Sequence, residues 1–459
     1  MVMTMIRYQI ARIAGNTSAF LLKLIKRRIP YYPGYVALKI CPNFLDYVKK
    51  PKVVIAVTGT NGKSTVCGIL NDFFESQGLK VLNNKGFNIK TGIATMFLKQ
   101  RGQADVALIE VDEKLSGEVF KSIEPDYYIC TNLFRDSMKT NSTVDYIYKK
   151  IKEGIPERTK VVLNADDLLV STLGENRPHV YFGIKDKIPN HNTKLIFNDM
   201  IYCPKCGNKL EYKDTKYFHI GNVECPNCGY TNPNRDYEAK VDYKTNELVI
   251  KYHKTTSKFP LKVTSIFNIY NFLAAISLIL ELGYSDTKVI EFLKDMKLIE
   301  SRYSIEKFGK YTLINHMSKG QNPVACSSVF EFAAYDEGKK CILLMLDDVM
   351  DRRDSSETIS WYYDTNFELF NNESIKQIII GGQRSKDVYV RMLFAGVNKD
   401  IISVVEKEED MASLISFKEI DKIFILHDIT LYDHSCMVAD LVRKMGEKYE
   451  DWNIISRNM

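Results

Sequence analysis

One strand-to-helix turn constrains this chain more than any other feature. Residues 52–65, with the sequence KVVIAVTGTNGKST, comprise an apolar run, a glycine-rich turn and the expected start of a helix. A buried strand that enters such a turn points backbone N–H groups and a positive helix end at a polyphosphate. The sequence therefore predicts a nucleoside triphosphate site, and the residues expected around the phosphates are Gly59, Thr60, Asn61, Gly62, Lys63, Ser64 and Thr65.

Two side chains of this turn have specific expected roles. We expect Lys63 to supply positive charge to the outer phosphates while contributing little to packing, and the Ser64 hydroxyl to hold Mg²⁺. Val57 stands where the general phosphate-binding loop has a glycine, five positions before Gly62. The motif is therefore the narrower form G-T-N-G-K-S-T.

A group of carboxylates follows a later apolar run, ADVALI. Glu110, Asp112 and Glu113 come directly after it, at the carboxyl end of an expected strand beside the phosphate-binding turn. Mg²⁺ prefers oxygen ligands and shares them with phosphates, so Glu110 and Ser64 are the predicted magnesium ligands. The alternative, which is stronger for Asp112 and Glu113, is a solvated acidic turn.

The chain of 459 residues is long enough for two or three domains. Apolar strand-like runs alternate with helical stretches, which favours parallel sheets covered on both faces. We divide the chain into a lead-in of residues 1–50, an ATP-binding α/β domain of residues 51–298 and a second, Rossmann-like α/β domain of residues 299–459. The net charge of +6 is mild and gives no indication of a nucleic-acid partner.

The N-terminal segment has no cleavable signal pattern and no apolar stretch long enough to span a membrane. Residues 5–28 are nevertheless apolar on one face and end in a basic cluster. Two interpretations stay open: a helix packed on the next domain, or a helix that touches anionic lipid at the inner face of the membrane. With ten cysteines and no signal, a reducing cytoplasm is the expected compartment.

A cysteine-rich insert is expected at residues 200–236. Two C-x-x-C pairs at this separation are typical of a zinc ribbon, in which four thiolates close a tetrahedron and leave no position for water. The predicted structural Zn²⁺ ligands are Cys203, Cys206, Cys225 and Cys228, and His219 in the loop between the pairs is expected not to bind the metal.

The motif G-T-N-G-K-S-T resembles that of the Mur ligase family, ATP-dependent enzymes that activate a carboxylate as an acyl phosphate. The segments TNLFRD, LNADD and NIYN follow in the family order. The resemblance implies that Glu110 is the family glutamate and that Asn268 reaches the adenine. Lys63 and Glu110 are accordingly assigned to catalysis.

Residues 33–300, including the cysteine insert, resemble the MurT branch of that family, the synthetase subunits that lack a separate UDP-sugar domain. That resemblance implies amidation of the D-glutamate carboxylate of lipid II or a related wall precursor. Ammonia would come from a GatD-like glutaminase, because no cysteine outside the ribbon sits in a recognisable nucleophile turn. We expect these other thiols to be buried or incidental: Cys67, Cys130, Cys326, Cys341 and Cys436.

The second domain resembles the MurT branch more loosely. Arg302 falls where the branch has a nucleotide-contacting arginine, and Asp364 matches an aspartate implicated in completing the partner's Cys-His pair, with Asp354 as the runner-up. Lys319 is separated from Asn322-Pro323 by two residues that the branch usually lacks. For a last polar group we expect ordinary surface or helix-cap roles: His427, Asp428, Asp433 and His434.

Two other functions compete with amidation. A Mur-like or folylpolyglutamate-like ligase would keep the ATP chemistry but attach an amino acid. A catalytically silent ATP-binding scaffold is the second alternative, and the presence of Lys63, Ser64 and Glu110 argues against it.

Overall fold

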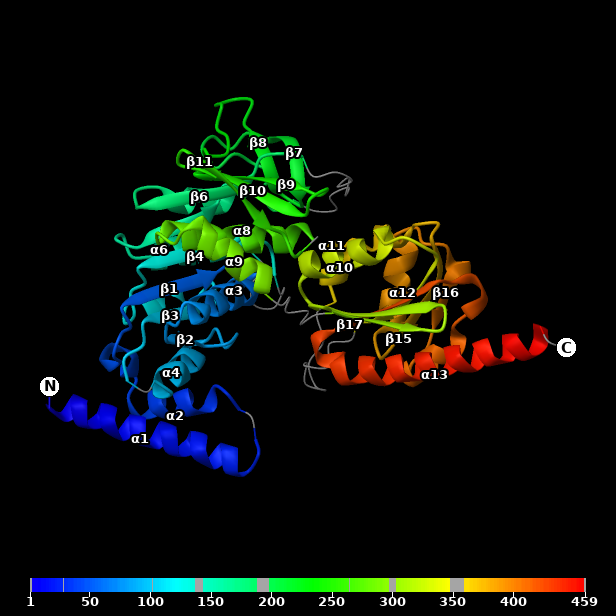
Figure 1. Ribbon diagram of the computed structural model, residues 1–459, viewed down its shortest axis with the longest axis horizontal. Helices are drawn as coiled ribbons and strands as arrows, with labels where there is room; N and C mark the ends of the chain where they lie inside the picture. Colours follow the sequence, from blue (N-terminus) through cyan, green and yellow to red (C-terminus); the bar gives the residue numbers. More distant parts are fainter. Residues whose placement is uncertain are drawn as a thin grey trace. The chain divides into compact units, whose positions relative to one another are not determined.

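The computed structural model describes residues 2–27, 29–100, 102–136, 143–187, 198–263, 265–296, 303–346 and 359–457 (Figure 1). The chain forms two compact units, the first of Met1–Phe134 with Thr143–Leu298 and the second of Arg135–Ser142 with Ile299–Met459. The predicted boundary near residue 299 lies outside the described residues, so the division into domains stays a prediction.

The first unit is built on a nine-stranded sheet. Its strand order is β11-β10-β9-β6-β5-β4-β1-β3-β2. Strands β1 to β6 and β9 run parallel, whereas β9, β10 and β11 form an antiparallel meander. The strands are β1 (Val53–Thr58), β2 (Val81–Asn83), β3 (Val106–Glu110), β4 (Tyr127–Cys130), β5 (Lys160–Asn164), β6 (His179–Ile184), β9 (Tyr237–Asp242), β10 (Glu247–Tyr252) and β11 (Thr255–Pro260).

Helices cover both faces of this sheet, as unbroken apolar strands require. Val54 and Ala56 of β1 belong to a core cluster with residues of the helices on one face. That face carries α2 (Tyr32–Ile40), α4 (Lys90–Leu98), α5 (Ser116–Phe120), α6 (Val144–Gly154) and α7 (Leu168–Ser171). The second group of helices, which pack on one another, comprises α3 (Lys63–Ser76), α8 (Ile266–Glu281) and α9 (Asp286–Asp295).

The N-terminal segment forms α1 (Val2–Leu24), which packs on α2 and α4. Short 3-10 turns at Phe44–Tyr47 (η1) and Thr172–Gly174 (η2) complete the first unit. The predicted packing of an N-terminal helix on the next domain is thus confirmed for the inner face of α1. Within the described part of the chain, no helix combines the length and apolarity that crossing a membrane requires.

The cysteine insert lies between β6 and β9, which are neighbours in the sheet. It contains the two-stranded antiparallel hairpin of β7 (Glu211–Tyr217) and β8 (Ile220–Glu224). The insert therefore occupies the place in the chain where a crossover helix usually joins two parallel strands.

The second unit contains a six-stranded sheet of order β12-β13-β17-β14-β15-β16, in which only β12 is antiparallel among the described strands. This is the predicted Rossmann-like arrangement. The strands are β12 (Tyr303–Phe308), β13 (Tyr311–Ser318), β14 (Lys340–Met345), β15 (Ile375–Gly381), β16 (Ile402–Val404) and β17 (Lys422–Asp428).

Successive side chains of β14 point to opposite faces of this sheet, and each face packs against its own group of helices. Ile342 and Leu344 face a core with α10 (Pro323–Tyr335), α11 (Trp361–Asp364) and α12 (Ser385–Phe394), whereas Cys341 and Leu343 face a core with α13 (Tyr432–Arg457). The remaining short turns are η3 (Phe367–Phe370), η4 (Lys399–Ile401), η5 (Glu408–Leu414), η6 (Phe417–Glu419) and η7 (Ile429–Leu431).

Candidate functional site

The glycine-rich turn joins β1 to α3, as the sequence predicts. Gly59 and Gly62 both have positive φ, +128° and +89°, a conformation that side chains other than glycine rarely adopt. A Cβ on Gly62 would lie 2.0 Å from the Asn271 side-chain oxygen, and one on Gly59 would lie 2.1 Å from the Thr131 hydroxyl. Both glycines are therefore required by conformation and by close packing.

Side chains of the TNLF segment hold the turn in place. The Asn61 amide donates to the Asn132 side chain over 2.9 Å, and the Thr131 hydroxyl donates to the Asn61 carbonyl over 2.6 Å. The Thr60 hydroxyl donates to the Phe134 carbonyl. These bonds fix the turn without using the first amides of α3, whose N-cap, Gly62, has no side chain to occupy them.

Lys63 is buried, which corrects the prediction that it contributes little to packing. Its ammonium group donates to the Glu113 carboxylate over 2.6 Å and to the Gly59 carbonyl over 2.5 Å, and only 10% of its side chain is exposed. Glu113 is 4% exposed at its side chain. The alternative of a solvated acidic turn is thus wrong for Glu113, which pairs with the lysine of the phosphate-binding turn.

The predicted magnesium ligands lie together. The Ser64 hydroxyl donates to the Glu110 carboxylate over 2.8 Å. Asn84 positions the Glu110 backbone on the other side, since its side chain accepts from the Glu110 amide over 2.9 Å and donates to the Glu110 carbonyl over 2.7 Å. Glu110 is buried, so the solvated-turn alternative is wrong for it as well.

The NIYN segment lies at the start of α8 and reaches the same turn. The Asn271 side chain, which packs against Gly62, donates to the Asn268 side chain over 3.4 Å. Tyr270 of the same segment donates to Asp166 over 2.6 Å. The adenine role of Asn268 stays a prediction, but its segment lies beside the phosphate-binding turn.

The donor set fits a magnesium nucleotide. The start of α3 offers backbone amides and a lysine to phosphate oxygens, and the adjacent hydroxyl and carboxylate oxygens of Ser64 and Glu110 are ligands that Mg²⁺ prefers.

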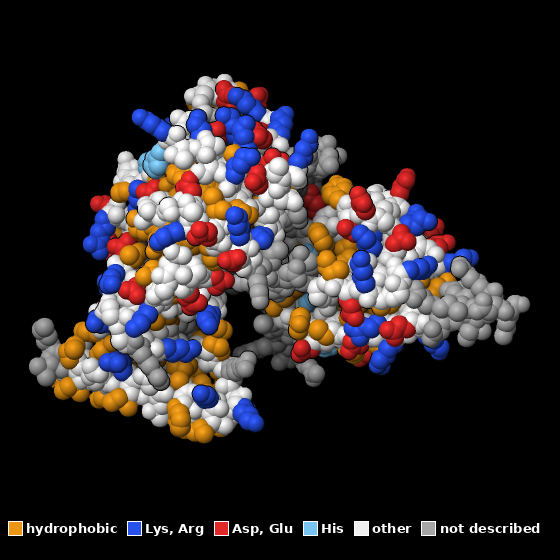
Figure 2. Space-filling view, viewed as in Figure 1, with side chains coloured by type: hydrophobic (Ala, Val, Ile, Leu, Met, Phe, Trp, Pro, Cys, Tyr) orange, Lys and Arg blue, Asp and Glu red, His pale blue; other side chains and the backbone are white. Residues whose placement is uncertain are grey.

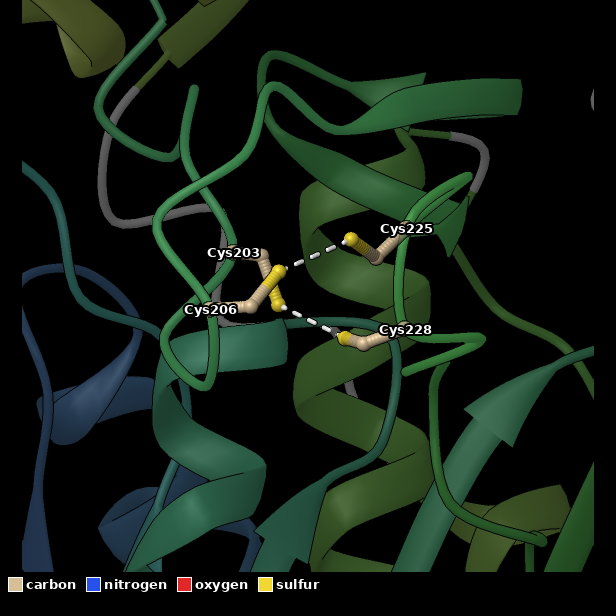
Figure 3. A group of neighbouring side chains, drawn as sticks. All are labelled: Cys203, Cys206, Cys225 and Cys228. Carbon is tan, nitrogen blue, oxygen red and sulfur yellow. Dashed lines mark hydrogen bonds between the residues drawn. The ribbon is translucent and has the colours of Figure 1, made fainter.

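A second candidate site is the group of four cysteines (Figure 3). Their sulfur atoms all lie within 4.8 Å of one another, with 3.6 Å between Cys203 and Cys228 and 3.4 Å between Cys206 and Cys225. A zinc tetrahedron with Zn–S bonds of about 2.3 Å requires sulfurs about 3.8 Å apart. The group therefore fits a closed structural zinc site.

The two C-x-x-C turns have the same backbone pattern. The Gly207 amide donates to the Cys203 carbonyl and the Gly229 amide to the Cys225 carbonyl, each over 2.9 Å. Both glycines have positive φ, +72° and +69°. This repeated turn places both thiols of a pair on the same side of the turn, where they face the two thiols of the other pair.

The hairpin of this insert is anchored to the LNADD segment. The Gly221 amide donates to the Asp166 carbonyl, and Arg235 forms a salt bridge with the Asp166 carboxylate over 2.6 Å. The same carboxylate accepts from Tyr270, and burial beside it raises the pKa of the Tyr270 hydroxyl well above its usual value. Asp166 therefore joins the insert to α8.

His219, at the turn of this hairpin, lies apart from the four sulfurs. Its ring packs on Phe134 with centroids 4.5 Å apart, and its Nε2 lies 3.7 Å from the Asp167 carboxylate. The described residues that could hold a metal ion as a group are the four cysteines, without His219. This placement agrees with the prediction that His219 does not bind the metal.

In the second unit, charged side chains of the TNLFRD segment meet residues that the sequence analysis singled out. Arg135 pairs with Asp364 over 3.1 Å, and Asp136 pairs with Lys319 over 3.0 Å. These side chains are between 13% and 34% exposed. Asp364 thus has an ion-pair partner that its position in the sequence did not suggest.

Asp364 is held by a short buried helix. In α11, Trp361 and Tyr362 are 2% and 1% exposed, whereas Asp364 stays partly accessible. The predicted roles of Arg302 and Asp354 cannot be compared with a structure, because both residues lie outside the described part of the chain.

The polar residues near the C-terminus, which include His427 and Asp428, lie in different environments. Asp428 caps η7 by accepting from the Thr430 amide, as expected for a helix-cap role. His427 is not a surface residue: it is 1% exposed in β17, its Nδ1 lies 2.7 Å from the Asp428 carbonyl, and burial lowers its pKa. His434 is exposed and lies 3.6 Å from Glu408.

Five of the six thiols outside the ribbon are buried, and burial raises the pKa of each: Cys41, Cys67, Cys130, Cys326 and Cys341. A raised pKa disfavours the thiolate that a nucleophile needs. Cys436 is exposed on α13.

Comparison with known families agrees with this architecture. Residues 57–232 match the Mur ligase middle domain, and residues 320–431 match the MurT ligase C-terminal domain. The chain therefore belongs to the Mur ligase family, which confirms the resemblance drawn from its motifs. Solved structures agree: a pseudomurein peptide ligase type C from Methanothermus fervidus has a TM-score of 0.67 at 22% identity, covering 88% of this chain and 81% of that one.

Within the family, the chain is similar over most of its length to proteins named lipid II isoglutaminyl synthase (glutamine-hydrolyzing) subunit MurT. The Staphylococcus aureus protein is 28% identical over 86% of this chain and 88% of its own length. The Streptococcus pneumoniae protein is 26% identical over 91% and 94%, respectively. A MurF ligase from Thermotoga maritima, solved with ADP, has the same fold with a TM-score of 0.53 at 15% identity, covering 87% of this chain and 81% of that one.

Three supporting residues were missed from the sequence: Glu113 as the partner of Lys63, Asn84 behind Glu110, and Asn271 against Gly62. A signal existed for Glu113 and Asn84, because each follows the end of a strand at the same edge of the sheet as β1. Nothing local to Asn271 indicates that it packs on the turn, since α8 begins about two hundred residues further along the chain.

Proposed function

We propose that this chain is an ATP-dependent amidating ligase that activates the D-glutamate carboxylate of lipid II or a related wall precursor. The observation that carries the proposal is the phosphate-binding site at the start of α3, in a chain that also contains a MurT-type C-terminal domain. We assign ATP binding to residues 51–298 and the MurT-type functions to residues 299–459.

Activation would proceed by phosphoryl transfer to the substrate carboxylate, which forms an acyl phosphate and releases ADP. Ammonia then attacks the acyl carbon, and phosphate leaves. ATP supplies the phosphoryl group. Ser64 and Glu110 would hold Mg²⁺, which would neutralise phosphate charge when bound. The amides at the start of α3 orient the phosphates, while Asn84 holds Glu110 in place.

Lys63 already has an acidic partner within the protein. Its ammonium group pairs with the Glu113 carboxylate over 2.6 Å. A phosphate oxygen near the start of α3 would compete with Glu113 for the same ammonium group. We infer that Glu113 keeps the buried lysine charged and in place until phosphate takes over part of the pairing.

We further propose that a GatD-like glutaminase supplies the ammonia. Asp364 is the residue assigned to complete the partner's Cys-His pair, because an aspartate can fix a histidine tautomer and stabilise its charged form. Its pairing with Arg135 supports a held orientation rather than a freely rotating carboxylate. Arg302 and Asn268 keep their proposed nucleotide contacts.

For the four cysteines we propose one structural Zn²⁺. The sulfur spacing of 3.4–3.6 Å between the pairs supports this assignment. The ion would hold the two C-x-x-C turns together and so stabilise the hairpin that is anchored at Asp166.

The deciding experiment supplies the purified chain with lipid II, ATP and Mg²⁺ and compares nitrogen donors. With ammonium, we expect ADP release and amidated product by mass spectrometry. With glutamine, the chain should need the glutaminase partner. Incorporation of an amino acid in place of ammonia would instead support the Mur-like or folylpolyglutamate-like alternative, and absence of any ATP-dependent product with every acceptor would support the silent scaffold.

A further inference from the structure

The outward face of α1 is an uncovered apolar stripe. At 100° per residue its members fall within an arc of about 100°, which places them on one face of the helix. The exposed apolar side chains of this stripe are Met3, Ile6, Ile10, Ile13, Phe20, Leu21 and Leu24. Met3 is 86% exposed and Ile13 is 67% exposed, values unusual for large apolar side chains gathered in one row.

The opposite face of α1 holds the helix on the unit. Tyr8 and Ala11 are buried, and Gly15 is so close to α4 that a Cβ there would lie 2.7 Å from Leu98. At 100° per residue these packing residues lie about half a turn from the stripe. The stripe therefore faces away from the core while the other side of the helix anchors it, as Figure 2 shows along the outer edge of α1.

Charge distinguishes this segment from the rest of the chain. The first acidic residue in the sequence is Asp46, so no carboxylate lies before it to balance the basic side chains. Arg12 lies over the Tyr8 ring at 5.9 Å, and Arg7 donates to the Ile40 carbonyl. The basic residues of the segment are Arg7, Arg12, Lys23, Lys26, Arg27, Arg28 and Lys39.

Exposed tyrosines continue the surface into α2. Tyr31, Tyr32 and Tyr35 are between 40% and 46% exposed. Tyrosine is favoured at the boundary between water and lipid because its ring is apolar and its hydroxyl stays hydrated. The α1–α2 surface thus combines an apolar row, a basic border and boundary aromatics.

We propose that this surface, formed by α1 (Val2–Leu24) and α2 (Tyr32–Ile40), binds the face of an anionic lipid bilayer, with α1 lying in the plane of the membrane. Apolar side chains enter the acyl boundary while the basic side chains meet lipid phosphates. A second copy of the chain is the less suitable occupant, because two copies would bring basic segments together with no carboxylate between them. The proposal does not depend on the ligase activity.

The test is co-sedimentation of the full chain with vesicles, without nucleotide. We expect binding to vesicles of phosphatidylglycerol mixed with phosphatidylcholine, weak binding to pure phosphatidylcholine, and a decrease with salt. Ile10→Asp with Ile13→Asp should weaken binding at least about tenfold, because two charges would have to enter the acyl boundary. The matched control is Ile305→Asp, at a 57% exposed isoleucine of β12, which should bind like the unchanged chain.

A second measurement covers the case of a variant that fails to fold. Phe20→Trp places a fluorescent reporter in the stripe, and its emission, taken relative to the unchanged chain, should be quenched by brominated lipid only in anionic vesicles. Equal binding to neutral and anionic vesicles, equal binding of the double variant, or a reporter that stays unquenched would each overturn the proposal. Dimers that the double variant abolishes, in a chain without vesicle affinity, would assign the stripe to a second copy instead.

Discussion

The two units differ in how deeply the ion pairs near their candidate functional residues are buried. In the first, Lys63 and Glu113 are paired with 10% and 4% of their side chains exposed. In the second, Asp364 and Arg135 are paired with 21% and 29% exposed. Since an ion pair is costly to break in proportion to its burial, we expect substitutions in the first unit to alter stability together with activity. Substitutions in the second should report function more directly.

The largest effect is expected for Lys63→Ala. Loss of the charge that clamps the phosphates should lower ATP-dependent turnover at least about a hundredfold. The change also leaves Glu113 buried without its lysine, which should destabilise the fold by about 3–5 kcal/mol. Turnover and urea unfolding measure the two effects separately.

The double variant Lys63→Ala with Glu113→Gln is the control, since it removes the stranded charge. It should recover stability but not turnover. A folded Lys63→Ala protein with undiminished ATP hydrolysis would refute the phosphate-binding assignment.

Removing a cysteine tests the four-cysteine group of the first unit. Cys203→Ser should reduce bound zinc from one per chain and lower the melting temperature by about 5 °C or more, because a closed thiolate site contributes directly to folding. Elemental analysis and thermal unfolding are the measurements. The control is Cys436→Ser, on the exposed face of α13, which should change neither the zinc content nor the melting temperature. A native protein that contains no zinc would contradict the structural-metal assignment.

Glu113→Gln tests the same buried ion pair by removing its negative charge. Without nucleotide the buried lysine loses its charged partner, so the melting temperature should fall. Added ATP and Mg²⁺ supply a replacement, so the increase in melting temperature on binding should exceed that of the unchanged chain. Asp112→Asn, at the neighbouring and more accessible carboxylate, is the control, and equal ligand shifts in all three proteins would contradict the exchange of partners.

The smallest change in stability is expected for Asp364→Asn, below about 1 kcal/mol, because the pair with Arg135 is partly exposed. In the complex with a glutaminase, glutamine-dependent turnover should fall far more than ammonia-dependent turnover. Arg135→Gln removes the partner that orients Asp364 but leaves the Asp364 carboxylate intact, so it separates the effect of orientation from the effect of losing the charge. Equal losses with both nitrogen donors would exclude Asp364 from the glutaminase role.

Local spacing made much of this molecule predictable. The phosphate-binding turn and the four cysteines each lie within short motifs whose geometry is set by neighbouring residues, and alternating apolar runs indicated both parallel sheets. Burial of Lys63 was mispredicted because its partner, Glu113, is fifty positions away. His427 was expected at the surface, yet it is the penultimate residue of a central strand.

The orientation of α1 illustrates a different limit. Its apolar residues were visible in the sequence, but a helical pattern does not say which of two apolar faces meets the core. Ala11 and Gly15 decide this, because their small size allows α2 and α4 to approach. Only the packed structure distinguishes that face from the uncovered stripe.

The position of the ribbon between β6 and β9 has a consequence for how the chain is made. The polypeptide must cross from the end of one parallel strand to the start of its neighbour, and a closed ribbon shortens that connection, whereas an open loop has a larger entropic cost. Strands β9, β10 and β11 leave the ribosome after the ribbon. On the proposed zinc assignment, metal supply during translation should therefore control how much newly made chain completes its sheet, even if the mature protein does not exchange the ion.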